Sequence, residues 1–150
     1  RIMPNINATV LEAMSAYCCS ESVTDDQKEF VNKLCSSFGK VMPLSESYFP
    51  LFCSIAGCAP AYAYMFIDSL ARSAVKNGMN KSVALEIAAQ TVLGSAKKIL
   101  ESDEHPWELI DKVCSPGGTT IEGVVSLQKD GFESAVCNAV DAALQKDKKV

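Results

Sequence analysis

Pro60 to Gly78 reads PAYAYMFIDSLARSAVKNG, and this stretch decides the fold class. Proline fits the first position of a helix, where its missing N–H has no helical partner to lose, and glycine commonly follows the last turn. Apolar residues recur at helical spacing between these two ends. The first two turns, residues 61–67, are apolar on every side, which predicts burial within a bundle or at an interface between subunits.

Further helical patterns lie on both sides of this stretch. Asn80 fits the capping position of the next helix, and Thr24 with Gln27 has the spacing of a capping box. Pro106 fits a helix start, and the following Cys114-Ser-Pro-Gly-Gly118 forbids continuation. We predict a helix from Thr24 that Gly39 stops, and a short one over residues 49–55 that ends at Gly57. Further helices are predicted over residues 60–77, 80–101, 106–113, 119–129 and 132–146.

Two segments near the N-terminus read as strands. Residues 8–19, ATVLEAMSAYCC, form an apolar run with a strand-like end, and residues 40–44 suit a second short strand. The predicted fold class is therefore mainly α, a helical bundle preceded by one or two short strands.

Composition excludes several classes of protein. With 150 residues, 48% hydrophobic and 21% charged, the chain is that of a globular domain. Fourteen Lys and Arg against eighteen Asp and Glu give a net charge of −4, so we expect no nucleic-acid partner. No uninterrupted apolar run reaches the roughly 18 residues that a membrane span needs. No signal peptide is evident. We therefore expect no membrane partner and a cytoplasmic location.

The cysteines do not suggest a metal or a disulfide framework. Seven cysteines are an odd number, they form no CxxC pair, and the chain has only one histidine. We expect reduced, buried thiols that pack as small apolar groups, and no metal.

The segment with chemical potential is Val113 to Gly123, VCSPGGTTIEG. Two glycines between a proline turn and a helix start allow backbone N–H groups to converge, and the first turn of the helix carries a partial positive charge. Ser115, Thr119 and Thr120 add hydroxyls at the same point. The segment therefore predicts a site for an anion, a carboxylate or a phosphate. The alternative is an ordinary helix cap, made by Thr119 or Ser115.

Residues 114–132, CSPGGTTIEGVVSLQKDGF, resemble the signature of pyrroline-5-carboxylate reductases. Arg1-Ile-Met-Pro-Asn5 resembles the cofactor-side motif of that family, and Ala56-Gly-Cys-Ala-Pro-Ala-Tyr62 its Ser-Gly-Ser-Gly-Pro-Ala-Tyr helix entry. Ala96-Lys-Lys and Glu104-His-Pro106 resemble the stretch before the signature. The chain departs from the pattern after Asn5, where the family has Thr-Pro, and before Pro60, where Ala56, Cys58 and Ala59 replace two serines and a glycine.

This resemblance implies the domain organisation. Residues 1–44 would be the end of an NAD(P)-binding Rossmann domain, and residues 45–150 a helical dimerisation and substrate-binding domain, similar to the C-terminal domain of 6-phosphogluconate dehydrogenase. The Gly-rich dinucleotide fingerprint is absent from the chain. The chain is thus interpreted as the C-terminal part of a longer enzyme, inactive alone, in which NADPH or NADH is bound mainly by an N-terminal domain that is missing here.

The resemblance also implies the reaction and the assembly. The whole enzyme would reduce 1-pyrroline-5-carboxylate to L-proline, the last step of proline biosynthesis, as a homodimer or an oligomer of dimers. Thr120 would be catalytic, donating a hydrogen bond to the imine nitrogen, and Asn5 would contact the cofactor. Five further positions would hold the substrate carboxylate or line the pocket: Ser115, Gly118, Thr119, Val113 and Asp103.

Two other interpretations remain open. The chain could be a catalytically silent helical dimerisation module, or part of a related imine or β-hydroxyacid reductase. His105, the one imidazole, directly precedes Pro106 at a helix start, which favours a turn or capping role over proton donation.

Overall fold

The computed structural model describes residues 1–147. The chain forms two compact units. One unit contains Arg1–Tyr62 and the described residues from Cys137 onward, and the other contains Ala63–Val136. Helices dominate both, so the prediction of a mainly α fold with short N-terminal strands is confirmed.

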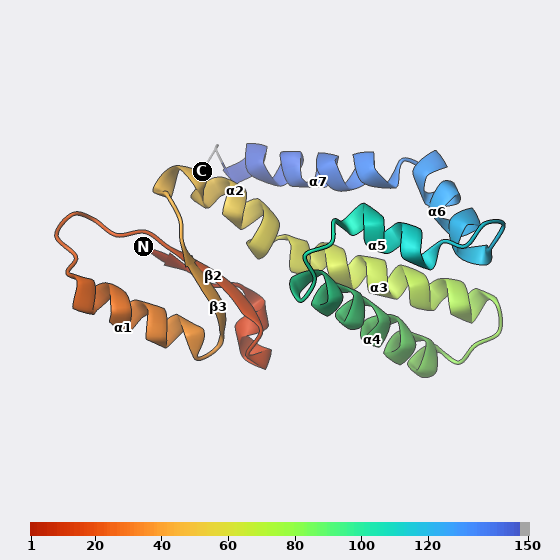
Figure 1. The fold of residues 1–150 in the computed structure, drawn as a ribbon, viewed down its shortest axis with the longest axis horizontal. Coiled ribbons are helices and arrows are strands. Elements are labelled where there is room, and N and C mark those ends of the chain that lie inside the picture. Colours follow the sequence, from red (N-terminus) through yellow and green to blue (C-terminus); the bar gives the residue numbers. More distant parts are fainter. Residues whose placement is uncertain (148–150) are drawn as a thin grey trace. The chain divides into compact units, whose positions relative to one another are not determined.

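The first unit contains a three-stranded sheet in the order β1-β2-β3 (Figure 1). β1 (Ile2–Met3) pairs antiparallel with β2 (Ala13–Tyr17), and β2 pairs parallel with β3 (Gly39–Pro43). The parallel pair is joined through α1 (Asp25–Ser36), which lies beside β3. The sheet therefore has one strand more than predicted, because β1 is too short to show a pattern in the sequence.

Register between the two parallel strands depends on a glycine. Gly39 pairs with Ala13 and has φ 151°, and a Cβ atom on it would overlap the backbone of Ala13. Only glycine permits this approach.

The strand predicted over residues 8–19 is wrong in its first half. Residues Ile6–Val10 form a 3₁₀ turn, η1, which ends at Leu11 with φ 61°. The backbone N–H of Glu12 donates to the carbonyl of Asn7 at 3.0 Å and closes this turn before β2 begins. The apolar run concealed it, because a turn of apolar residues and a strand share the same composition.

Helix α1 begins as predicted. The Thr24 hydroxyl accepts from the Gln27 N–H at 3.4 Å, and the Gln27 side chain accepts from the Thr24 N–H at 3.0 Å, so the capping box is complete. On α1, Cys35 is buried, and farther along the chain of this unit Phe49 is buried as well.

The sequence predicted that a helix ends at Gly57, and the structure shows that it does not. The chain runs through η2 (Glu46–Tyr48), α2 (Phe49–Phe52), a π-helical turn η3 (Cys53–Gly57) and α3 (Ala59–Lys76) without leaving helical conformation. A π-turn absorbs an extra residue within a helix. Gly57 therefore lies within a wider turn of one continuous helix and does not stop it.

The joined helix changes one expectation from the sequence. Glu46–Lys76 is 31 residues long and, by length and composition alone, apolar enough to cross a membrane. The sequence suggested no such span because polar residues interrupt this stretch before an apolar run reaches about 18 residues. An apolar helix that a second subunit covers passes the same test, so this finding is weak evidence for a membrane.

In the second unit, α3 packs against α4 (Lys81–Leu100) through small side chains. Ala71, Ala84 and Ala88 form the buried core, with Ile67 and Ala74 packed against it. The Asn80 side chain accepts from the Ser82 N–H at 2.9 Å and caps α4, as predicted.

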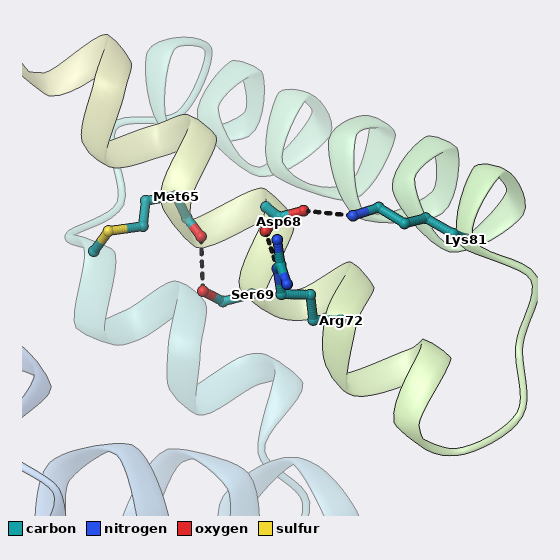
Figure 2. Close-up of polar contacts among 5 residues, drawn as sticks. All are labelled: Met65, Asp68, Ser69, Arg72 and Lys81. Carbon is teal, nitrogen blue, oxygen red and sulfur yellow. Dashed lines mark hydrogen bonds and ion pairs between the residues drawn. The ribbon is translucent and has the colours of Figure 1, made fainter.

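An ion-pair cluster joins the same two helices (Figure 2). Asp68 on α3 accepts from Arg72 one turn later and from Lys81 at the start of α4, the latter at 3.2 Å. These two cations hold the pKa of the Asp68 carboxyl below its usual range.

Three helices follow: α5 (Pro106–Val113), α6 (Thr119–Lys129) and α7 (Phe132–Asp147). Their starts agree with the prediction. The rings of Phe66 on α3 and Phe132 on α7 lie 5.9 Å apart and tie these helices together. The last three residues of the predicted C-terminal domain, 148–150, lie outside the described residues.

Much of the apolar surface is uncovered. Tyr64 and Met65, in the stretch predicted to be buried on every side, are 58% and 72% exposed. Ile87 on α4 is 51% exposed. The described residues of the single chain therefore do not supply the burial that the sequence predicts.

The expectation of buried thiols holds for Cys35 alone. All seven cysteines are free, but two are exposed and four are partly exposed. Within residues 1–147 no group of three side chains could hold a metal ion.

Candidate functional site

A tight turn precedes α6. Its four residues are Ser115–Gly118, and the Gly118 N–H donates to the Ser115 carbonyl at 3.0 Å. Pro116 occupies the second position and Gly117, with φ 67°, the third, which is the pattern of a type II turn. Proline presets one backbone angle and glycine accepts the positive one, so this sequence folds locally into one shape.

The N-terminus of α6 differs chemically from those of α1, α4 and α5. The other three are capped by the side chains of Thr24, Asn80 and His105. α6 has Gly118 at its capping position, and in the described part of the chain no side chain caps it. The alternative of a cap made by Thr119 or Ser115 is therefore not what the structure shows. The first N–H groups of α6 remain available to a ligand.

The Ser115 hydroxyl lies against this helix start. A Cβ atom on Gly118 would overlap the Ser115 Oγ atom and would lie 3.1 Å from the Ser115 carbonyl oxygen. Because Gly118 has no side chain, the Ser115 hydroxyl can occupy the space beside it. The turn bond already engages the Gly118 N–H, so the free backbone donors here belong to the first residues of α6, Thr119 and Thr120.

Thr119 and Thr120 are both exposed at the start of α6. Among residues 1–147 neither hydroxyl has a hydrogen-bond partner. The structure therefore brings four of the predicted residues, Ser115, Gly118, Thr119 and Thr120, to one accessible point. This point offers hydroxyl and N–H donors, and its partial charge is positive.

His105 caps α5 as expected. Its Nδ1 accepts from the Trp107 N–H at 3.2 Å, and the Glu108 carboxylate accepts from the His105 N–H at 3.0 Å. An imidazole nitrogen engaged in this way is used for local structure.

Asp103 and Val113 are both exposed, and they flank an ion pair that the sequence did not reveal. Glu104, next to Asp103, accepts from Lys112, next to Val113, and this contact lowers the pKa of the Glu104 carboxyl. The pair ties the loop before α5 to the last turn of α5. Glu104 lies in the loop before α5, so the helical spacings that favour ion pairs do not apply to it and no pattern predicted the pair.

Asn5 lies in the first unit, where its side chain makes two hydrogen bonds to backbone groups. Its Oδ1 accepts from the Met14 N–H at 3.2 Å, and its Nδ2 donates to the Ala56 carbonyl at 3.0 Å. It thus links β2 to the π-turn. One N–H of the amide is left for another partner.

With this geometry in place, similarity to known proteins decides the family. The family described as pyrroline-5-carboxylate reductase dimerisation matches residues 46–150. The chain belongs to the pyrroline-5-carboxylate reductase family. A curated relative of that name from Synechocystis sp. is 40% identical over 150 residues, which are 100% of this chain and 56% of the relative.

Solved reductases have the same fold. The structure of 1-pyrroline-5-carboxylate reductase from Streptococcus pyogenes matches with TM-score 0.95 and 43% identity, over 100% of this chain and 58% of that one. Pyrroline carboxylate reductase from Plasmodium falciparum, solved with NADP bound, matches with TM-score 0.93 and 37% identity, over 99% and 60%.

The chain spans little more than half the length of the reductases that it matches. It covers 55% of the relative from Glycine max and 56% of the relative from Escherichia coli. Membership in the family is therefore shown for this part of the protein.

Proposed function

We propose that the protein reduces 1-pyrroline-5-carboxylate to L-proline and that this chain supplies its substrate-binding and subunit-assembly part. The observation that carries the proposal is the uncapped start of α6, with the Ser115 hydroxyl beside it, in a member of this family. The substrate is a cyclic imine with one carboxylate, so the enzyme must bind an anion and place a donor near nitrogen.

The carboxylate is the group that suits the helix start. Unpaired N–H groups at a helix N-terminus favour a negative charge, typically by 0.3–1 kcal/mol when exposed. Thr119 and the Ser115 hydroxyl would donate to the carboxylate oxygens. Gly118 contributes by lacking a side chain, because its own N–H already closes the turn. Asp103 and Val113 would line the pocket nearby.

Thr120 would act at the imine nitrogen. Reduction of the carbon–nitrogen double bond places electron density on nitrogen, so a hydrogen-bond donor there lowers the barrier. The Thr120 hydroxyl is exposed and lies one residue beyond Thr119 on α6. If the carboxylate is fixed at Thr119 and Ser115, the ring nitrogen can lie within reach of Thr120.

The nucleotide that supplies hydride in this reaction is NADPH or NADH, and it would be bound mainly by a part of the protein outside this chain. The residues present fit a minor share of that binding. The Asn5 amide retains one free N–H, while its other groups hold Met14 and Ala56 in place. Asn5 would therefore hold the backbone of Met14 and Ala56 in position near the nucleotide and donate one hydrogen bond to it.

Domain organisation and assembly follow from the same proposal. Residues 1–44 would close a Rossmann domain, and residues 45–150 would form the dimerisation domain. The exposed apolar side chains of α3 and α4 would be buried in a homodimer, or in an oligomer of dimers. We expect the protein in the cytoplasm, where biosynthetic reduction by soluble nucleotides takes place.

A turnover assay tests the proposal. The purified protein at its natural length is mixed with 1-pyrroline-5-carboxylate and NADPH or NADH, and both loss of reduced nucleotide and formation of proline are followed. We expect proline in equal amount to the nucleotide consumed. Turnover of another imine or of a β-hydroxyacid, with none of pyrroline-5-carboxylate, would support a related reductase. No turnover of any of them by the folded protein would support a silent dimerisation module.

A further inference from the structure

Cys53 begins the π-helical segment η3, and Cys58, one turn later, is the residue that caps its end. The Cys58 N–H donates to the Cys53 carbonyl at 3.0 Å, which is a bond from residue i+5 to residue i. In an ordinary α-helix residues five apart point in different directions, but in a π-turn they come above one another. The wide turn therefore places both cysteines on one side of the helix.

The Cys53 sulfur points toward the following turn. It lies 3.3 Å from the position that a Cβ atom on Gly57 would occupy, next to Cys58. A side chain at residue 57 would crowd this sulfur, and glycine leaves the space open. Both cysteines are partly exposed, so a small reagent can reach them.

We propose that Cys53 and Cys58 are a redox site, which closes reversibly into an intramolecular disulfide across the π-turn. A disulfide requires Cα atoms about 4.4–6.8 Å apart and side chains that face each other. A single π-turn suits these conditions, because it stacks residues five apart and the Cys53 sulfur points toward the turn that leads into Cys58. The other cysteines of the first unit are Cys18, Cys19, Cys35 and Cys137, and none of them lies in the π-turn.

The reaction balances with a small disulfide such as oxidised glutathione. A thiolate of the pair attacks one sulfur of the reagent, forms a mixed disulfide and releases one glutathione thiolate, which takes up a proton. The second cysteine then attacks its partner's sulfur and releases the second glutathione. Two protein thiols are oxidised to one disulfide, and one glutathione disulfide is reduced to two thiols.

The surroundings favour Cys58 for the first attack. Burial raises the pKa of the Cys53 thiol, and negative charge at Cys58 and Asp147 raises it further, against a smaller lowering by Arg1. The Cys53 thiolate is thus scarce near neutral pH. Cys53 acts second, when the mixed disulfide is already beside it, and closure accelerates as pH rises.

One tryptic peptide reports on the pair. No Lys or Arg occurs between Val41 and Ala71, so trypsin releases residues 41–72, which contain both cysteines and no other. The native protein is incubated with oxidised glutathione, the remaining thiols are blocked with N-ethylmaleimide, and the digest is weighed by mass spectrometry. We expect this peptide without label and lighter by two hydrogens, and with two labels after prior reduction by dithiothreitol.

Single variants test the order of attack. Cys53→Ser is expected to accumulate glutathione on Cys58, while Cys58→Ser leaves Cys53 mostly unmodified. Cys137→Ser, at an exposed cysteine, leaves the bridge intact and is the matched control. The proposal is overturned if the 41–72 peptide of the native protein carries two labels while the exposed Cys19 has reacted with glutathione. Bridging that requires denaturant would overturn it equally, and equal modification of the two variants would contradict the order.

Discussion

The Ser115 hydroxyl occupies the space that a side chain on Gly118 would need, so the two residues share one position at the start of α6. Pro116 and Gly117 fix this relationship through the turn, and the bond from the Gly118 N–H to the Ser115 carbonyl closes it. The anion site that we propose therefore depends on a residue that offers no donor of its own to the ligand.

Gly118→Ala tests this relationship. The added Cβ displaces the Ser115 hydroxyl, and a group misplaced by about 1 Å can cost a large factor in binding or rate. We expect the KM for pyrroline-5-carboxylate to rise about 10-fold or more. Gly123→Ala is the control, because a Cβ there meets nothing within 4 Å and alanine favours the helix. Equal KM values in the two variants would show that substrate binding does not depend on the position of the Ser115 hydroxyl.

The exposed apolar side chains of α4 predict the effect of a charge on assembly. Ile87→Asp introduces an uncompensated carboxylate where the proposed dimer buries apolar surface, which costs several kcal/mol. We expect a monomer mass by light scattering, with helical content unchanged, because the Ile87 side chain is half exposed within its own unit. Glu86→Lys, its neighbour, changes charge without uncovering apolar surface. An unchanged dimer mass in Ile87→Asp would exclude this face of α4 from the interface.

The Asp68 cluster predicts a dependence of stability on pH. Arg72 and Lys81 lower the pKa of Asp68 in the folded chain, so its contribution is present above the unfolded pKa of about 3.9 and is lost as pH falls through the folded value. Asp68→Asn is expected to lower the melting temperature slightly at neutral pH and not at all in strong acid. Asp141→Asn, at an exposed position of α7, is the control. If Asp68→Asn lowers the melting temperature by the same amount in strong acid, the loss of stability does not come from the Asp68 charge.

Local rules predicted the helix starts well because each start depends on a few neighbouring residues. Thr24 with Gln27 and Asn80 stand where capping was expected, and His105 with Pro106 begins α5. The turn before α6 could likewise be predicted from Pro116 and Gly117, because their backbone preferences are intrinsic.

The failures of prediction involve distant partners. Nothing local distinguishes the 3₁₀ turn at Ile6–Val10 from a strand, and the Asn5 side chain just before it contacts Met14 and Ala56, the latter far along the chain. Gly57 looked like a helix end, and its role within a π-turn becomes visible only when both flanking helices are seen. For the site, sequence and resemblance named four residues that do gather at the start of α6, Ser115, Gly118, Thr119 and Thr120. That the Gly118 N–H is already engaged in the turn could not be read from the sequence.

The most direct test of the account is Thr120→Val, measured in the protein at its natural length beside Thr120→Ser and Ser115→Ala. Valine matches the shape of threonine without its hydroxyl, and serine keeps the donor. We expect kcat to fall about 100-fold in Thr120→Val and to remain near normal in Thr120→Ser, as for the loss of a positioned donor. Ser115→Ala should instead raise KM, because it loosens the carboxylate. Near-normal kcat in a folded Thr120→Val protein would contradict the proposed role of Thr120 and of the α6 start in the reaction.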